Sequence, residues 1–454
     1  MREGSLDAPT RHVIDWRNPD FVDAGNIDAE LRRVFDICHG CRRCFNLCDA
    51  FPRLFDLIDD SETGELDSVD SADFRSVTDA CTFCDMCFMT KCPYVPPHEF
   101  DLDFPHLMLR VRAAEFRRGE RSFMDRRIAD TDTNGRLGTT FSPLANWALD
   151  RENRLTRPLM QAACGIHAEA ELPRFNAASL VAAAAREPLD VNRKAPAYPR
   201  KAVIYATCFS NWNDAGIGGA FRRILAHNGI ETRVVHPGCC GMPKLELGDL
   251  ADVAKRARTV SGELLGWHDD GWDIVSLVPS CSLMMKFEWP LIVPDDGSVT
   301  RLASVVQDAS EYIVSISRSE GLAGGLEPID GPVTLHVACH ARAQNMGAKA
   351  AEMLRLIPDT AVNVIERCSG HGGSWGVRTG TFETGMKVGK AVMRNVARHD
   401  PEGAGVVASE CPLAGLHIGQ GVARLEGREA PALQACHPIQ LMARSWGLEE
   451  RGPG

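Results

Sequence analysis

The sequence predicts an α+β protein of several domains, with a helical cysteine-rich domain first and two duplicated α/β domains with parallel sheets after it. Three observations predict this fold class. The chain has 454 residues, too many for one ordinary core. Two short cysteine runs lie near the N-terminus, and a pattern of cysteine-bearing loops occurs twice in the second half. We place an N-terminal segment at 1–30, the cysteine-run domain at 31–128, a helical connector at 129–199, and the two copies at 200–325 and 326–454.

Composition narrows the functional class. The formal net charge of -11 argues against a general nucleic-acid binder, because contact with a phosphate backbone needs a basic surface. Small-molecule or protein partners are favoured instead. The N-terminal segment lacks the apolar core of a signal peptide, and no run approaches the ~18 apolar residues of a membrane span. We therefore expect a cytoplasmic protein, or one bound peripherally to the inner face of a membrane.

The chain contains 17 cysteines. Disulfides are rare in the cytosol, where thiols are kept reduced. Metal binding or redox chemistry is therefore the leading explanation for these residues, and their spacing discriminates between the two.

The first cysteine run has the spacing C-x2-C-x2-C-x3-C, in which three thiolates bind one iron-sulfur cube and the fourth binds a neighbouring cube. A second run follows, with four residues before its last cysteine and Pro93 directly after it. Two runs predict two [4Fe-4S] clusters. Under the exchange rule of two-cluster ferredoxins, one cluster is held by Cys38, Cys41, Cys44 and Cys92, and the other by Cys81, Cys84, Cys87 and Cys48.

A pair of zinc sites is the alternative explanation of these runs. Structural zinc is usually bound by two separated C-x2-C pairs that close one tetrahedron, whereas a triple run suits the face of a cube. The acidic stretch between the two runs, residues 56–73, is expected to be a solvated surface loop or an acidic docking face.

The segment after the second run predicts a helix. Asp103 is a candidate N-cap, Pro105 suits the first turn, and the helix would extend to Phe116. Cys164, in the connector, is expected to be a small buried residue rather than a ligand. A basic stripe accompanies the helix and forms either a solvated face or a docking site for an acidic partner or anionic lipid. Its members are Arg110, Arg112, Arg117, Arg118, Arg121, Arg126 and Arg127.

The second half contains an internal repeat with a period of about 130 residues, which indicates a duplicated domain. The matched pairs are Cys208 with Cys339, Cys239 with Cys368, and Cys281 with Cys411. Short apolar runs, each expected to form a strand, precede these cysteines at 202–206, 232–235 and 274–278 in the first copy and at 333–337, 361–365 and 405–408 in the second.

Alternating strands and helices predict a parallel sheet in each copy. Ligands of such sheets bind beyond the carboxyl ends of the strands, which is where these cysteines fall. Three cysteine-bearing loops are therefore expected to converge on one crevice in each copy. Glycines crowd two of the loops, at 237–241 and 368–373, and allow the backbone to approach a cluster closely.

With these motifs in place, the chain resembles the heterodisulfide-reductase-related iron-sulfur proteins, and within them is most similar to the iron-sulfur subunits of anaerobic glycerol-3-phosphate dehydrogenases. The resemblance covers nearly the whole chain from Cys38 onward. It rests on both cysteine runs and on Cys239-Cys240-Gly241 with Cys208 and Cys281. It also rests on the short sequence motifs around the second-copy cysteines and on His437-Pro438.

The resemblance implies two four-iron clusters in a ferredoxin-like N-terminal domain, followed by cysteine-rich CCG domains that hold unusual clusters in heterodisulfide reductases. The expected pattern is depleted in this chain. The first copy has Met284 in place of a second paired cysteine, which leaves a four-thiol set able to hold a further cluster. That set consists of Cys208, Cys239, Cys240 and Cys281.

The second copy is more depleted, with Ser369 and Ala414 at the missing cysteine positions. The remaining thiols are Cys339, Cys368 and Cys411, so a cluster there needs a fourth ligand. The candidates for that ligand are His340, His371 and Cys436, although histidines near such loops are more often hydrogen-bond partners.

The resemblance favours an electron-transfer subunit that relays electrons between a partner dehydrogenase, such as a flavoprotein, and quinone or another carrier. The sequence has no flavin or nicotinamide fingerprint, and Gly216 to Gly219 match one poorly, so an organic substrate would be oxidised on another chain. A disulfide or thiol reductase with catalysis at a CCG cluster is the alternative. A non-enzymatic metal-binding module is the third hypothesis.

Overall fold

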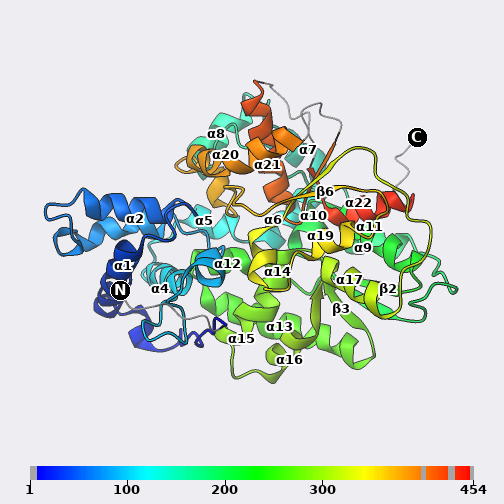
Figure 1. Cartoon of the computed structure of the whole chain (residues 1–454), viewed down its shortest axis with the longest axis horizontal. Helices are drawn as coiled ribbons and strands as arrows, with labels where there is room; N and C mark the ends of the chain where they lie inside the picture. Colours follow the sequence, from blue (N-terminus) through cyan, green and yellow to red (C-terminus); the bar gives the residue numbers. More distant parts are fainter. Residues whose placement is uncertain (1–7, 400–404, 428–434, 450–454) are drawn as a thin grey trace.

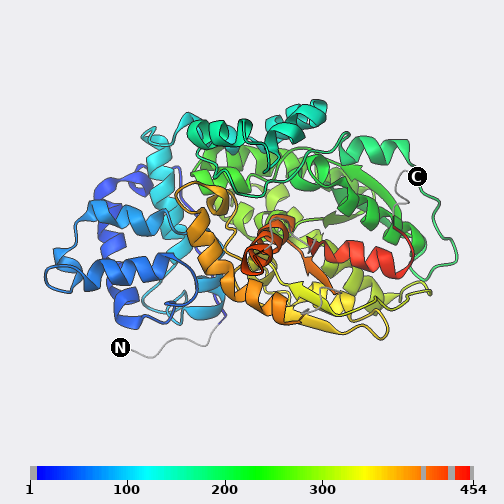
Figure 2. The same cartoon turned by 90° about the horizontal axis from the view of Figure 1, so that it is seen from above.

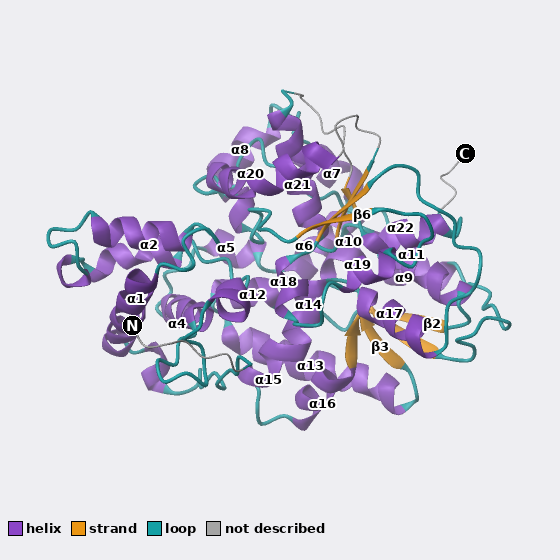
Figure 3. Cartoon of the chain, in the orientation of Figure 1, coloured by secondary structure: helices purple, strands orange, loops and turns teal. Residues whose placement is uncertain are grey.

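The computed structural model describes residues 8–399, 405–427 and 435–449. The described chain is α+β, with helices throughout and strands confined to two parallel sheets in the second half, as the sequence predicts (Figure 3). The helices that carry the two cysteine runs lie at one end of the molecule, and the two sheets lie at the other (Figures 1 and 2).

Residues 31–128, named here the N-terminal module, are helical. Helix α1 (Ala24–Cys41) begins where the Asp23 carboxylate accepts a hydrogen bond from the backbone N–H of Asn26. It contains Cys38 and Cys41 and ends at Arg42, whose φ of 50° turns the chain within the first cysteine run. The other elements around this module are η1 (Pro19–Val22), α2 (Ala50–Asp59), η2 (Leu66–Ser68), η3 (Ser71–Phe74), α3 (Arg75–Thr78), η4 (Cys87–Lys91) and α4 (Phe104–Arg117).

The acidic stretch at 56–73 was expected to be a solvated loop, and that expectation is wrong in part. Helix α2 covers its beginning, and two short 3-10 helices follow. Leu66, Val69 and Phe74 are buried, and the Phe74 ring contacts Phe35 of α1 at a centroid distance of 5.1 Å. These apolar residues, spaced between the acids, anchor the insertion to the core, and the acidic side chains face outward.

The helix predicted from Asp103 is confirmed as α4, with the Asp103 carboxylate accepting from the N–H of His106. The basic stripe along it is largely occupied by contacts within the chain. Arg112 is buried and donates to the carbonyls of Cys81, Thr78 and Glu246. The other contacts join Arg110 to the Asp20 and Phe21 carbonyls, Arg117 to the Trp16 carbonyl, and Arg121 to Glu115.

The connector is helical, as expected, and lies along the sheet domains. Helix α5 (Phe123–Ile128) ends the N-terminal module just before it, and the connector's own elements are α6 (Thr131–Thr140), α7 (Ser142–Leu149), α8 (Thr156–Cys164) and α9 (Leu180–Arg186). Gly135 and Gly138 allow α6 to lie against the Trp212 and Phe175 rings, because a Cβ at either position would overlap those rings. Cys164 was expected to be buried but is half-buried at the end of α8, where its carbonyl accepts from Arg378.

The first copy contains a parallel sheet with the strand order β2-β1-β3-β4, and the three predicted strands are confirmed. The strands are β1 (Lys201–Tyr205), β2 (Glu231–Val235), β3 (Asp273–Ser276) and β4 (Val306–Asp308). The helices are α10 (Cys208–Trp212), α11 (Ala215–His227), α12 (Met242–Leu247), α13 (Leu250–Asp269), α14 (Pro279–Leu283), η5 (Met284–Glu288), α15 (Trp289–Ile292), α16 (Gly297–Val305) and α17 (Ala309–Ser319).

The second copy repeats this topology, with the strand order β6-β5-β7-β8, and its three predicted strands are also confirmed. The strands are β5 (Val333–His336), β6 (Val362–Ile365), β7 (Val406–Ser409) and β8 (Ala435–Cys436). The helices are α18 (Cys339–Ala343), α19 (Lys349–Leu354), η6 (Trp375–Val377), α20 (Phe382–His399), α21 (Pro412–Leu425) and α22 (Pro438–Ser445).

The described helices include none with the length and apolarity needed to cross a membrane.

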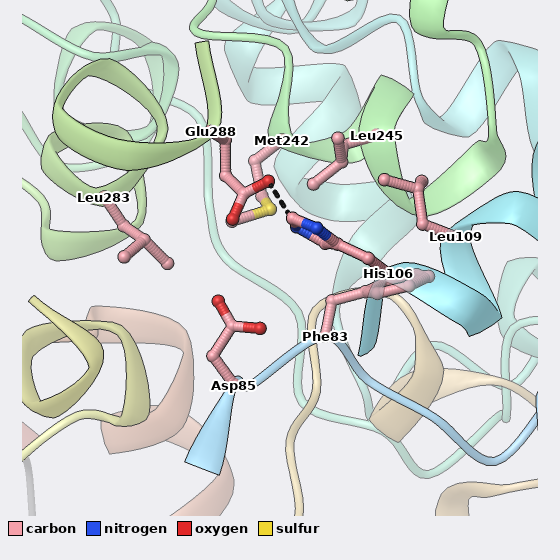
Figure 4. A pocket seen from close by; sticks show the side chains of 8 residues that line it. All are labelled: Phe83, Asp85, His106, Leu109, Met242, Leu245, Leu283 and Glu288. Carbon is pink, nitrogen blue, oxygen red and sulfur yellow. Dashed lines mark hydrogen bonds and ion pairs between the residues drawn. The ribbon is translucent and has the colours of Figure 1, made fainter. Parts of the chain in front are cut away.

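A buried ionic junction joins the N-terminal module to the first copy. The Arg11 guanidinium contacts Asp85 at 2.8 Å, Asp103 at 3.0 Å and Glu288 of η5 at 3.0 Å. Figure 4 shows the adjoining pocket, where the His106 ring of α4 points toward Glu288 at 3.1 Å. Burial alone would raise the pKa of Glu288, but the charge of His106 lowers it to about 2, so the carboxylate stays ionised.

Replacing Arg11 should destabilise this junction strongly. Arg11→Ala leaves three carboxylates near one another without their cation, and losing one partner of a buried pair costs about 3–5 kcal/mol of unfolding free energy. Urea denaturation of the full chain measures this loss. Arg17→Ala is the matched control, because the Arg17–Asp295 pair at 3.5 Å is exposed and screened by solvent, so that its loss should change the stability little. Equal losses in the two variants would contradict the assignment.

Candidate metal centres

The cysteine loops of the first copy meet at the carboxyl edge of its sheet. Cys208 follows β1, Cys239 and Cys240 follow β2, and Cys281 follows β3. Because β1 lies between β2 and β3, the three loops open side by side.

The four first-copy thiols form one group. The sulfur atoms of Cys208 and Cys239 are 3.8 Å apart, and Cys240 forms thiol hydrogen bonds with Cys239 and Cys281. These two hydrogen bonds, together with burial, raise the pKa of Cys240. Burial raises the pKa of Tyr205, and the charges of all four thiols raise it further. The Tyr205 hydroxyl donates to the Gly238 carbonyl at 2.6 Å. The N–H of Gly241, which has a φ of 87°, points at the Cys239 sulfur at 3.4 Å.

The connector completes this first-copy group from outside the repeat. The Asp132 carboxylate, on α6, accepts from the Cys239 backbone N–H at 2.8 Å and from His236 at 2.8 Å. Arg256 of α13 donates to the same carboxylate at 3.1 Å. The neighbouring Thr131 hydroxyl is buried beside the Cys208 and Cys239 thiols and has no hydrogen-bond partner. Sequence reasoning missed both residues, because no spacing rule relates a connector helix to a loop 107 positions further on.

In the N-terminal module, one group of thiols lines a cavity. The walls include Cys38, Cys41, Cys44 and Cys92 together with the rings of Phe51, Phe55 and Tyr94. Burial raises the pKa of Cys38, and the charges of the other three thiols raise it further. Apolar walls around four sulfurs provide a low-dielectric site that four thiolates can occupy together only with a compensating cation.

A second group lies beside the first. Burial raises the pKa of Cys48, followed by the charges of Cys84 and Cys81. The pKa of Cys87 is raised by burial and then by Cys84, Cys81, Cys44 and Cys48, so the two groups are neighbours. The last cysteine of each run thus lies with the first three of the other run. Phe83 and Asp85, on either side of Cys84, have φ angles of 50° and 61°, which make the sharp turns of this loop.

Two second-copy thiols contact this N-terminal loop. Cys339 forms hydrogen bonds with Cys368 and with Cys84, which together with burial raise its pKa. The hydrogen bond from Cys339 lowers the pKa of Cys368 to about 7. The N–H of Gly370 points at the Cys368 sulfur at 3.4 Å, matching Gly241 in the first copy. The cysteines of different domains are therefore in direct contact.

The third second-copy thiol lies in different surroundings. Burial raises the pKa of Cys411, and the charges that act on it most are the carboxylates of Glu410 and Glu246. Glu246 belongs to α12 of the first copy, and burial raises its pKa to about 7. Gly373, with a φ of 61°, lies so close to this carboxylate that a Cβ would overlap it.

The fourth-ligand candidates of the second copy are engaged elsewhere or lie apart. His340 binds the Ser280 hydroxyl at 2.8 Å and the Phe83 carbonyl at 3.0 Å, which occupies both ring nitrogens. The Cys436 thiol contacts the Val407 carbonyl at 3.5 Å, within the sheet. His371 is buried beside His417, with a ring-centroid distance of 5.8 Å and neither nitrogen hydrogen-bonded. The first two candidates are therefore structural residues.

The donor chemistry fits iron-sulfur clusters. Each N-terminal group and the first-copy group offers four thiols. Across the described residues, no three His, Cys, Asp or Glu side chains converge closely enough to hold a single metal ion. Thiolates around one zinc ion lie at Zn–S distances of about 2.3 Å, whereas a cube places its ligands around a larger body.

The glycines at 216–219 serve helix packing. They lie within α11, where a Cβ on Gly218 would overlap the Leu180 side chain of α9. This placement agrees with their poor match to a dinucleotide-binding fingerprint.

The family model of the cysteine-rich CCG domain matches residues 333–419, which spans most of the second copy. No curated protein matches the chain. The match shows a cysteine-rich CCG domain in the second copy, although the cysteine loops of that copy carry fewer cysteines than those of the first.

The buried His371 predicts a pH-dependent stability difference. Burial, aided by His417, lowers the pKa of His371 to about 3 in the folded chain. Below about pH 6.5 the imidazole is therefore protonated in the unfolded chain but stays neutral in the folded one. Proton binding to His371 in the unfolded chain lowers the free energy of unfolding of the parent as the pH falls. The His371→Leu variant has no imidazole at this position and does not lose that stability. The variant should therefore gain about 2 kcal/mol relative to the parent between about pH 7.5 and pH 5.

Urea unfolding of parent and His371→Leu at the two pH values checks this prediction. The same difference at both pH values would show that the imidazole is not held neutral in the folded chain.

Proposed function

We propose that this chain is the iron-sulfur electron-transfer subunit of an oxidoreductase, with two [4Fe-4S] clusters in a ferredoxin-like N-terminal domain. One would be held by Cys38, Cys41, Cys44 and Cys92, and the other by Cys81, Cys84, Cys87 and Cys48. The observation that carries the proposal is the crossed grouping of the two runs, in which each fourth cysteine lies with the other run. Such clusters supply one-electron transfer, with potentials set by burial and by hydrogen bonds to sulfur.

The first-copy thiols support a further cluster. Cys208, Cys239, Cys240 and Cys281 provide four donors, and the Asp132 carboxylate holds the Cys239 loop by accepting from the Cys239 backbone N–H. The buried Thr131 hydroxyl, which has no hydrogen-bond partner, would donate to a sulfur of a cluster bound there and tune its potential, because hydrogen bonds to cluster sulfurs change that potential. The second copy lacks a fourth thiol and is not assigned a cluster.

The connector supports a docking role. Large apolar side chains are exposed along residues 123–159, a stretch that includes α7, which carries no charged side chain. A concentration of exposed apolar residues marks an interaction surface. We assign it to a partner redox protein, such as a flavoprotein dehydrogenase. Its members are Phe123, Leu137, Phe141, Leu144, Trp147, Leu155 and Leu159.

The sequence resemblance to the iron-sulfur subunits of anaerobic glycerol-3-phosphate dehydrogenases supports this relay role. In that role electrons would pass from the partner dehydrogenase to quinone or another carrier, with attachment at the inner face of a membrane. Helix α6 leads from the exposed apolar surface at Phe141 to the first-copy thiols at Thr131 and Asp132. A partner bound there would lie one helix length from those thiols.

Paired cysteine variants test the crossed grouping. Each single variant, Cys38→Ser, Cys81→Ser or Cys92→Ser, should lose about four irons per chain, because one ligand of one cube is removed. The double variant of Cys38 and Cys92 should lose the same four, and the double variant of Cys81 and Cys92 about eight. Iron and acid-labile sulfide are measured after anaerobic purification.

Cys164→Ser is the control and should keep all of its iron, because Cys164 lies in the connector. Losses of about eight irons from the Cys38 and Cys92 pair, with four from the Cys81 and Cys92 pair, would contradict the crossed grouping and assign each run its own cluster.

A further inference from the structure

The three second-copy thiols do not form one group, although the repeat pairs each of them with a first-copy cysteine. Cys339 and Cys368 lie close enough to shift each other's pKa, and Cys84 of the N-terminal module also raises the pKa of Cys339. The charge of Cys368 also raises the pKa of Cys48 in that module. Burial raises the pKa of Cys411 most, and the charged groups that raise it further are Glu410 and Glu246, not another thiol. The second copy thus presents a thiol pair and a separate single thiol.

The corresponding first-copy pair differs in its surroundings. Cys208 and Cys239 are also close, but Cys240 and Cys281 complete a four-thiol set around them. In the second copy Ser369 occupies the position of Cys240, so its pair lacks that completion. The further sulfur that acts on Cys339 is that of Cys84, which is already grouped with Cys48, Cys81 and Cys87.

Rigid contacts hold the thiol pair against the N-terminal loop. His340, next to Cys339, binds the Phe83 carbonyl, which is adjacent to Cys84 in the chain. On the Cys368 side, Gly372 has a φ of 54° and lies against Thr82, where a Cβ would overlap the threonine side chain. Both cysteines are therefore placed by contacts on either side of Cys84.

We propose that Cys339 and Cys368 form a redox-active dithiol that exchanges two electrons with the cluster held in part by Cys84. This inference rests on the proposed function, since it needs that cluster as the electron acceptor. It assigns the second copy a thiol–disulfide site of its own in place of a bound cluster.

The reaction balances within the chain. Each thiol loses one proton and one electron, and an S–S bond forms between Cys339 and Cys368. With clusters bound to the N-terminal thiols, two one-electron acceptors would take up the two electrons, and the two protons would pass to water. In the reverse direction Cys339 and Cys368 would take up two electrons and two protons, the S–S bond would break and two thiols would form. The pair thereby links one-electron cluster chemistry to a two-electron partner.

Thiol mapping on the cluster-loaded full chain tests the site. The protein is poised at a series of potentials under anaerobic conditions, its free thiols are alkylated, and its peptides are analysed without reduction. We expect a disulfide between the Cys339 and Cys368 peptides at the oxidising end, which disappears on reduction with dithionite. The absence of this disulfide at every potential, in protein that contains its iron, would overturn the proposal.

Serine variants distinguish a dithiol from cluster ligands. Cys339→Ser and Cys368→Ser should retain the iron and sulfide of the parent and take up two electrons fewer per chain in a reductive titration. Loss of about four irons in either variant would make that thiol a ligand and overturn the proposal. Cys436→Ser is the matched control and should retain both the iron and the two electrons, because Cys436 lies within the sheet.

The outcomes separate this inference from the proposed function. Parent protein without iron and sulfide would contradict the cluster assignment itself. Parent protein with its iron, but without the Cys339–Cys368 disulfide, would contradict the dithiol alone.

Discussion

The loop from Cys81 to Asp85 is the constraint on which the arrangement of the molecule depends. It carries two of the thiols of the second N-terminal group, and every neighbouring domain contacts it. Its two residues with positive φ, Phe83 and Asp85, turn Cys84 toward the second copy. The groups that reach the loop are the Arg11 and Arg112 guanidinium groups, the His340 ring, the Cys339 thiol and the backbone of Gly372.

Most of these contacts are polar and buried, so each buried polar group needs one particular partner from the neighbouring domain. A carbonyl such as that of Phe83 must be hydrogen-bonded when it is buried, and His340 supplies the partner from another domain. Asp85 and Glu288 both form ion pairs with Arg11, which joins the N-terminal module to the first copy. These contacts hold the cysteine loops of the two domains in one arrangement.

Local features of the fold were predictable from the sequence. The strands before Cys208 and Cys339 are short apolar runs, and both were predicted to within about two residues. The helix N-cap at Asp103 and the internal repeat were also predicted, because both can be recognised from short patterns in the sequence. The acidic insertion was misjudged because its buried residues, Leu66 and Phe74, are isolated among acids.

Contacts between domains were not predictable. The spacing of cysteines indicates a thiol set within one repeat, but it cannot show that Cys339 faces Cys84 while Cys411 faces Glu246. Thr131 likewise belongs to a connector with no motif. These relations arise from the packing of separate domains, which depends on surface shape and on buried charges such as Arg11.

The central claim is that the N-terminal module holds two adjacent iron-sulfur clusters. Iron, zinc and acid-labile sulfide, measured together with the electron paramagnetic resonance of the dithionite-reduced full chain, test it most directly. The account predicts at least about eight irons per chain with matching sulfide, and a broadened signal from two interacting clusters. Zinc without sulfide, or the signal of one isolated cluster, would contradict it.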